Sequence, residues 1–281
     1  MKFKVVELNS DLKNKKVFDV SLNKDCINSI IGSFESGDLL LIDENSICLD
    51  VKLYGNSKKE TILIQKDNCK RIIKLYKVCK KIIKKLRHKK IEFDGTFYVN
   101  NLKNKKNNND FMLSAMLDTY FNFNAFKRLG KATEYASDYI DKENSLNNMC
   151  DFKDNLCVSH RELGKKGCTG CCPSFCKYTK QGVCTVRNLS CKIFMCDYLE
   201  KKGYYFTPNT IPILKLHLSF FERFNCFGLL FKPEKKVISR LWLVRILSVS
   251  LVIVFVLLIL TFLIWYNIEV YFEIFSICDI F

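Results

Sequence analysis

The longest hydrophobic segment of the chain lies near its C-terminus. From Ile246 to Ile268 there is no charged residue, and 18 of these 23 positions are Ile, Leu, Val, Phe or Trp. A helix needs about 20 apolar residues to cross the hydrocarbon core of a bilayer. The alternative is a buried core helix, but this run is long and uniformly apolar for that setting. The pattern therefore predicts one transmembrane helix over residues 246–268.

The charges that flank this segment predict its orientation. The N-terminal flank carries five basic residues, Lys232, Lys235, Lys236, Arg240 and Arg245. The other flank carries three acidic ones, Glu269, Glu273 and Asp279. Basic flanks stay in the cytoplasm, and the N-terminal residues MKFKVVELNS lack the apolar region of a secretory signal peptide. We therefore expect a single-pass membrane protein with the bulk of the chain in the cytoplasm and a short tail, 269–281, on the opposite side.

A second periodic pattern predicts an amphipathic helix from about Asn68 to Lys89. Apolar residues recur there at steps of three and four, which places them on one face. The other face is basic, and residues 70–90 contain no acidic residue. Seven of the cations are candidates for binding anionic lipid headgroups or another polyanion: Lys70, Arg71, Lys74, Lys77, Lys81, Lys84 and Lys85. The alternative is a helix that packs by its apolar stripe and exposes an ordinary solvated lysine surface.

Short apolar runs bounded by turn residues predict a small sheet in the first hundred residues. The candidate strands are Lys2–Leu8, Leu39–Ile42, Ile47–Leu53, Thr61–Gln65 and Ile91–Val99. Gly95 marks a bulge or bend in the last of them. We expect an α+β fold, in which a small antiparallel sheet with helices against it forms a module over residues 1–100.

Two further segments follow a linker rich in Lys and Asn at 101–109. Residues 110–145 predict one or two helices, with a break at Gly130. Residues 205–240 predict a juxtamembrane amphipathic segment, which carries too many charges to span a bilayer. This segment either lies in the headgroup interface or packs on the cysteine-rich module that precedes it, because a broad apolar face suits both settings.

Cysteine content changes the picture of the remaining segment, residues 150–200. Seven of the 15 cysteines fall within 29 residues: Cys168, Cys171, Cys172, Cys176, Cys184, Cys191 and Cys196. Thiols at this density are oxidised to disulfides or bind metal, and either one staples a segment too short to build its own core. Cytosolic thiols are kept reduced, so the predicted topology favours a metal-binding module. The inverted topology would instead make the segment an extracellular disulfide framework.

The spacing of the cysteines favours more than one metal site. Cys168 and Cys171 form a C-x2-C knuckle, which presents two thiolates to one tetrahedral ion. Cys172 follows directly, and adjacent side chains point apart, so we do not expect both to bind the same ion. With Cys157 and His160 upstream, the ligands suffice for two ions, or for one iron–sulfur cluster and a structural zinc. The alternative for His160 is a solvated loop imidazole, because one histidine near cysteines is weak evidence of a ligand.

The cysteines recur in three pieces: Cys168, Cys171 and Cys172, then Cys184-Thr-Val-Arg187, then Cys191-Lys-Ile-Phe-Met-Cys196. This order resembles the YkgJ-type cysteine cluster family of zinc- or iron-chelating proteins. The resemblance covers about residues 157–200. It implies that these cysteines chelate metal, and it implies no defined reaction.

Charge and motif content argue against two classes of function, nucleic-acid binding and catalysis. The formal net charge is +16, with Lys far more frequent than Arg, yet no recognisable nucleic-acid-binding module accompanies it. The chain also lacks a phosphate-binding glycine loop, a nucleophile elbow and an H-E-x-x-H motif. We therefore identify no catalytic residue and favour a protein that is not an enzyme, with a metal-dependent enzyme as the open alternative.

Two hypotheses for the function remain. The first is a membrane-tethered protein whose cysteines bind zinc or an iron–sulfur cluster near the cytoplasmic leaflet. The second is a membrane-anchored scaffold, in which zinc is purely structural and the basic helix binds anionic lipid or an acidic partner. Bound metal and acid-labile sulfide distinguish the two, because a cluster contains sulfide and a structural zinc site does not.

Overall fold

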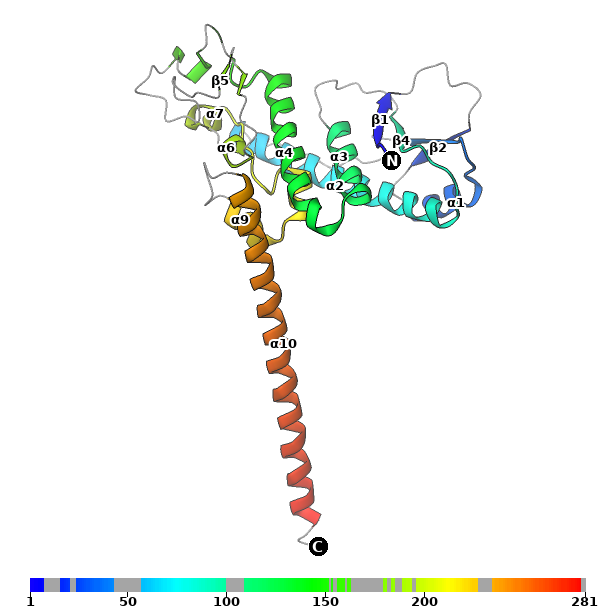
Figure 1. Ribbon diagram of the computed structural model, residues 1–281, viewed down its shortest axis with the longest axis vertical. Helices are drawn as coiled ribbons and strands as arrows, with labels where there is room; N and C mark the ends of the chain where they lie inside the picture. Colours follow the sequence, from blue (N-terminus) through cyan, green and yellow to red (C-terminus); the bar gives the residue numbers. More distant parts are fainter. Residues whose placement is uncertain are drawn as a thin grey trace. The chain divides into compact units, whose positions relative to one another are not determined.

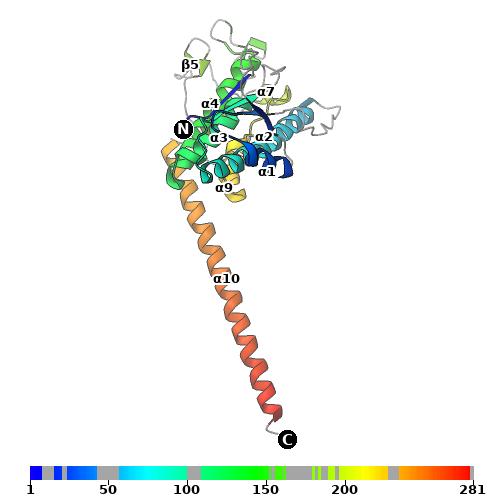
Figure 2. The same cartoon turned by 90° about the vertical axis from the view of Figure 1, so that its right-hand side faces the viewer.

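The computed structural model describes residues 1–7, 16–20, 24–42, 57–99, 109–151, 153, 156–159, 161–162, 179–180, 183–184, 189–193, 196–226 and 234–278. The chain divides into two compact units, Met1–Glu234 and Lys235–Phe281, whose elements are drawn in Figures 1 and 2. The strand predicted at Ile47–Leu53 falls outside the described residues. So does the linker predicted at 101–109, except for Asn109, which begins a helix.

A four-stranded parallel sheet lies in the N-terminal part of the first unit. Its strands are β1 (Lys4–Glu7), β2 (Val17–Val20), β3 (Leu39–Ile42) and β4 (Thr96–Val99). They lie in the order β1-β4-β3-β2, and every neighbouring pair is parallel. The prediction of an antiparallel sheet is therefore wrong, whereas the combination of a small sheet with helices is confirmed.

Helical crossovers explain the parallel arrangement. α1 (Lys24–Ser33) connects β2 to β3, and α2 (Ser57–His88) lies between β3 and β4 in the chain. Antiparallel neighbours can be joined by a tight turn, but parallel neighbours need a crossover of a dozen or more residues. Helices then cover the sheet, and all four side chains of Leu39–Ile42 are buried, as a continuous apolar run requires.

The amphipathic helix predicted at 68–89 is confirmed as the larger part of α2. Its apolar stripe is buried in the core, through Cys69, Ile72, Leu75, Tyr76, Val78, Cys79, Ile82, Ile83 and Leu86. The strand predicted at Thr61–Gln65 is wrong, because these residues form earlier turns of the same helix. A short apolar run is compatible with either state, and here packing of the long helix decides it.

Two consecutive helices follow β4 in the chain (Figure 1): α3 (Asn109–Asn122), which packs on α2, and α4 (Ala125–Asn147), which packs on α3. α3 contacts α2, β1 and α4. The helices predicted over 110–145 are confirmed, but the break between them lies at Asn124 and not at Gly130. The side chain of Asn124 accepts a hydrogen bond from the Lys127 amide at 3.0 Å. This N-cap starts a new helix there, since it satisfies an amide that has no partner within the helix.

Short elements complete the first unit. They are β5 (Thr179–Lys180), β6 (Val183–Cys184), α6 (Leu189–Ile193), α7 (Asp197–Lys201), α8 (Pro212–His217) and α9 (Phe220–Cys226). β5 and β6 pair as an antiparallel ribbon. α8 packs against α4, α2 and α3 and buries Ile213 and Leu214 completely. The segment predicted at 205–240 therefore contains two short helices, of which α8 packs on other helices of the unit.

The second unit consists mainly of α10 (Glu234–Cys278), a helix of 45 residues. By length and composition, its stretch Ile238–Glu269 is suited to crossing a membrane. Its 32 residues extend about 48 Å at 1.5 Å per residue, compared with about 30 Å of hydrocarbon in a bilayer. The helix predicted over 246–268 is confirmed. It continues into the residues predicted as a tail from 269, and Figure 2 shows it as one uninterrupted helix.

Candidate functional site

The structure places four of the predicted metal ligands on defined parts of the fold. Cys184 ends β6, Cys191 lies in α6, and Cys196 is the N-cap of α7, where its side chain is buried. Cys157 is also buried. The other candidates lie outside the described residues: Cys168, Cys171, Cys172, Cys176 and His160. Among the residues that are described, no three His, Cys, Asp or Glu side chains are grouped to hold a metal ion, so the metal site stays a prediction.

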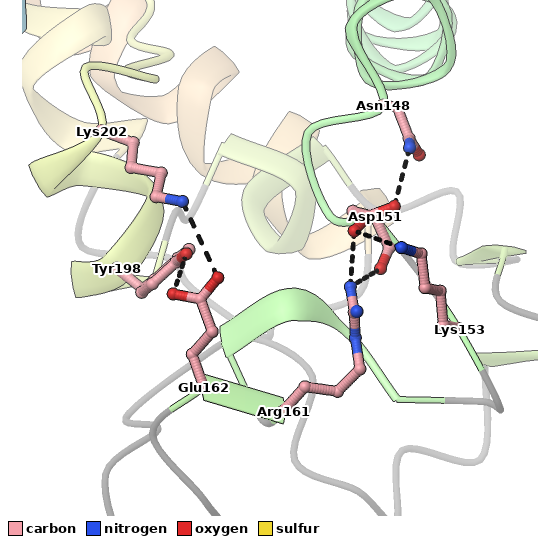
Figure 3. Close-up of polar contacts among 7 residues, drawn as sticks. All are labelled: Asn148, Asp151, Lys153, Arg161, Glu162, Tyr198 and Lys202. Atoms are coloured by element: carbon pink, nitrogen blue, oxygen red, sulfur yellow. Dashed lines mark hydrogen bonds and ion pairs between the residues drawn. The ribbon is translucent and has the colours of Figure 1, made fainter.

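A polar network holds the turn that precedes residues 163–197, which we call the cysteine segment (Figure 3). Asp151 accepts hydrogen bonds from Arg161 at 2.6 Å and from Asn148 at 3.0 Å, and the Lys153 ammonium lies 3.7 Å from its carboxylate. The bond from Arg161 is the main reason that the pKa of Asp151 lies below its ordinary value. Asn148 ends α4 in the left-handed conformation. These contacts connect the end of α4 to the turn that precedes the cysteines.

Backbone hydrogen bonds close this turn around Cys157. Lys153 and Leu156 exchange two backbone bonds, of 3.0 and 2.8 Å. The Val158 amide donates to the Cys150 carbonyl at 2.8 Å, and the Arg161 amide donates to the Cys157 carbonyl at 3.1 Å. Cys157 is therefore held in an ordered turn before the cysteine-rich stretch begins.

The helix α6, which contains Cys191, is attached to α4. Leu189 and Ile193 of α6 are buried, and α6 packs against α4. The Lys192 ammonium forms an ion pair with Asp141 of α4, although the Lys192 side chain is only 5% exposed. A buried ammonium needs such a partner, because an unpaired charge is costly in the interior. This pair therefore fixes α6 to the body of the unit.

A second network connects the two ends of the cysteine segment to each other. We call Glu162, Tyr198 and Lys202 the clasp (Figure 3). The Tyr198 hydroxyl donates a hydrogen bond to the Glu162 carboxylate, and the Lys202 ammonium lies 4.0 Å from the second oxygen of that group. The hydrogen bond with Tyr198, followed by the charge of Glu162, raises the pKa of Lys202. The clasp spans residues 163–197, so it brings together positions that are distant in sequence.

Two other cysteines lie in the apolar core of the first unit. Cys69 and Cys79 are fully buried on α2. Burial raises the pKa of Cys69 to about 11 and that of Cys79 to about 12. Metal binds the thiolate form, which burial at these two positions disfavours. The Cys69 thiol instead donates to the Asn209 carbonyl at 3.5 Å, which is a packing role.

The seven predicted polyanion ligands lie along the outward side of α2, but they are not equally available. Lys70, Lys74, Lys77 and Lys84 are exposed, whereas Arg71, Lys81 and Lys85 are half-buried. Lys85 donates to the Asn28 side chain at 2.7 Å, and Lys84 lies 5.3 Å from the Tyr120 ring centroid. A hydrogen bond with Lys84 is the main reason that the pKa of Tyr120 is lowered. Lys66, which the sequence prediction omitted, extends the exposed row by one turn.

A hollow of about 450 Å³ lies where β3 and β4 begin, lined in part by Asp38, Glu92, Asp94 and Tyr98. Asp38 accepts the Glu35 amide at 2.6 Å and Asp94 accepts the Thr96 amide at 2.7 Å. These two carboxylates therefore stabilise local turns. Ligands of parallel α/β sheets bind at the opposite, carboxyl ends of the strands, so we assign no function to this hollow.

Three features of the described residues bear on function: the clasped ends of the cysteine segment, the cationic side of α2, and the long apolar helix α10. All three are observed in this chain alone, without reference to a related protein. No protein-family model matches this chain, and neither comparison with curated proteins nor comparison with solved structures finds a significant match.

Proposed function

We propose that this protein is a membrane-anchored, cytoplasm-facing metal-binding protein, whose cysteines chelate zinc or an iron–sulfur cluster. The observation that carries the proposal is the run of seven cysteines within 29 residues, Cys168 to Cys196. Its resemblance to the YkgJ-type cysteine cluster family supports the same chemistry. The proposal assigns no catalytic reaction to the site.

The apolar helix supports the choice of metal over disulfides. Basic residues crowd the N-terminal side of the uncharged run Ile246–Ile268, and acidic residues follow it. A bilayer orients such a helix with its basic flank in the cytoplasm. The cysteine segment then lies on the reducing side, where dense thiols bind metal and do not form a disulfide framework.

The clasp also supports the proposal, because it lowers the entropic cost of ordering the metal ligands. A metal site built from a long segment must overcome the entropy lost when the chain ends are brought together. The contact between Tyr198 and Glu162 already joins residues on either side of 163–197. The Lys192–Asp141 pair fixes α6, near the C-terminal end of this stretch, to α4. Part of the entropic cost of ordering the ligands is therefore offset by the fold around them.

Metal analysis of the full chain tests the proposal. The protein is purified anaerobically in detergent, and bound metal, acid-labile sulfide and the absorption spectrum are measured. We expect about one or two zinc ions per chain, or iron with sulfide and visible charge-transfer bands. Replacement of Cys168 and Cys171 by serine should reduce the metal content, because it removes both thiolates of the knuckle.

A matched control separates the cluster from the other thiols. Cys69→Ser retains a donor for the Asn209 carbonyl and should leave the metal content unchanged. A wild-type chain without bound metal after anaerobic purification would refute the metal proposal. Labelling of the cluster thiols only from outside intact cells would instead show the inverted topology.

The cationic side of α2 favours a second candidate function. In this alternative, zinc only folds the cysteine segment, and the exposed row Lys66, Lys70, Lys74 and Lys77 binds anionic lipid or an acidic partner. The apolar stripe of α2 is buried, so the helix would act through charge alone. Stoichiometric zinc that resists exchange, with no sulfide, would favour this scaffold role.

A further inference from the structure

The helix α9 has an inverted polarity for a surface helix. Its three phenylalanines are exposed, by 69% for Phe220, 62% for Phe221 and 76% for Phe224. Its acidic residue, Glu222, is only 1% exposed. At 100° per residue the three aromatic positions share one face. α9 therefore directs its rings outward and its carboxylate inward, which is the reverse of the usual arrangement.

Polar contacts hold α9 in this orientation. The Ser219 amide donates to the Glu222 carboxylate at 2.7 Å, and the Glu222 amide donates to the Ser219 hydroxyl at 3.3 Å. This reciprocal pair is a capping box, and it fixes the start of the helix. Arg223 donates to the Lys215 carbonyl of α8 at 3.3 Å. Since α8 is itself packed in the core, the exposed rings are presented by a supported element.

The position of α9 in the chain indicates what covers these rings. Residues 227–233 alone separate it from α10, and an extended connection of this length reaches at most about 28 Å. Any bilayer that contains the apolar stretch of α10 is therefore within reach. The connection and the start of α10 also carry Lys232, Lys235, Lys236 and Arg240, which favour a surface of anionic headgroups.

We propose that α9 inserts Phe220, Phe221 and Phe224 into the headgroup region of the leaflet next to the N-terminal end of α10. Aromatic rings are favourable at this depth, and amphipathic segments with such a face lie in the plane of the interface. The inference rests on membrane anchoring by α10 and adds a second contact with the same membrane. That contact holds the first unit against the surface and limits its rotation about the connection.

Fluorescence quenching by brominated lipid tests the insertion in the full chain. The native tryptophans, Trp242 and Trp265, are replaced by phenylalanine, and Phe224→Trp provides a single reporter in reconstituted vesicles. We expect lipid brominated near the headgroup to reduce the emission by about twofold, and lipid brominated deep in the chains to reduce it less. Phe220→Trp provides a second, independent reporter if the first variant does not fold.

A matched control reports on exposure without insertion. Phe126, at the start of α4, is 76% exposed, the same as Phe224, and Phe126→Trp in the same background should not be quenched. Equal quenching at both positions would overturn the assignment to α9. Far-UV circular dichroism and thermal unfolding establish that each variant folds like its parent.

A further reporter separates this inference from the anchoring on which it rests. A chain that retains only Trp265 should be quenched if α10 lies in the bilayer. Quenching of Trp265 without quenching at position 224 would overturn insertion by α9 and leave anchoring intact. Blue-shifted but unquenched emission at position 224 would also overturn it, because the rings would then be covered by a second copy of the chain. An unquenched Trp265 would overturn both proposals.

Discussion

Removal of the Tyr198 hydroxyl is expected to weaken metal binding by the cysteine segment. This hydroxyl donates to Glu162 across the segment 163–197. Tyr198→Phe keeps the ring, which is buried against the unit, and removes only the hydrogen bond. The variant therefore tests whether the connection between the two ends contributes to metal affinity.

The structure limits the size of the effect. A hydrogen bond to a charged acceptor contributes about 1.5–3 kcal/mol when it is well protected. The Glu162 side chain is 52% exposed, so solvent screening reduces this contribution to about 1 kcal/mol. A change of about 1 kcal/mol corresponds to a factor of about five in an equilibrium constant. We expect Tyr198→Phe to lower the apparent metal affinity by about this factor.

Competition with a soluble chelator measures the effect on the full chain. The fraction of metal retained at equilibrium is compared for the wild type and Tyr198→Phe, with thermal unfolding measured in parallel. Tyr135→Phe is the matched control, because its hydroxyl donates to the Asp118 carboxylate at 2.6 Å. This contact joins α4 to α3, away from the cysteine segment, so its loss should affect stability and not metal affinity.

Equal chelator sensitivity of Tyr198→Phe and the wild type would refute the role of the clasp. An equal loss of affinity in Tyr135→Phe and Tyr198→Phe would refute it as well. In that case metal retention would follow the overall stability of the unit and not the closure of its cysteine segment.

Three other predictions test the fold itself. Gly95→Ala should lower the free energy of unfolding by more than about 1 kcal/mol, because φ is +89° and an added Cβ would lie 2.5 Å from the Lys2 carbonyl oxygen. Gly37 has a similar φ of +92° but no atom within 4 Å of an added Cβ, so Gly37→Ala should be less destabilising when both are measured by denaturant unfolding. Met116→Ala should destabilise by about 2–5 kcal/mol, since Met116 is fully buried; a loss under 1 kcal/mol would contradict this packing. Burial raises the pKa of Cys79 from 9.0 to about 12. The contribution of the protonated thiol to the free energy of unfolding is therefore complete below pH 9 and is lost as pH rises through 12. The wild type should lose on the order of 4 kcal/mol of stability between pH 9 and 12 through this thiol, and Cys79→Val should not show this loss. An unchanged dependence of stability on pH would contradict the burial of the thiol.

Periodicity predicted the long helices but not their ends. The core face of α2 follows from apolar residues at steps of three and four, and its members from Cys69 to Leu86 are buried. Thr61–Gln65 was compatible with a strand, because five apolar and polar positions carry too little periodicity to exclude either state. The break between α3 and α4 depends on the Asn124 cap, and a glycine elsewhere in the segment was a stronger signal in the sequence.

The candidate site was only partly predictable. The density of cysteines indicated a metal-binding segment, but neither the Tyr198–Glu162 contact nor the Lys192–Asp141 pair follows from spacing. Each joins residues that are distant along the chain, so it depends on how α6 and α7 pack. The exposure of Phe126, an aromatic residue within the predicted helical segment 110–145, likewise depends on how the helices pack.

The sequence by itself determined α10 and the cysteine segment, because both depend on local content: an uncharged run from Ile246 to Ile268 and seven thiols within 29 residues. Tertiary structure decided the direction of the strands, since alternation along a strand is the same whether its neighbour is parallel or antiparallel, and the crossovers through α1 and α2 make them parallel. It also decided the roles of α8 and α9. Their sequences are similarly apolar, but burial against α4 covers α8, and the capping contact of Glu222 turns the phenylalanines of α9 outward.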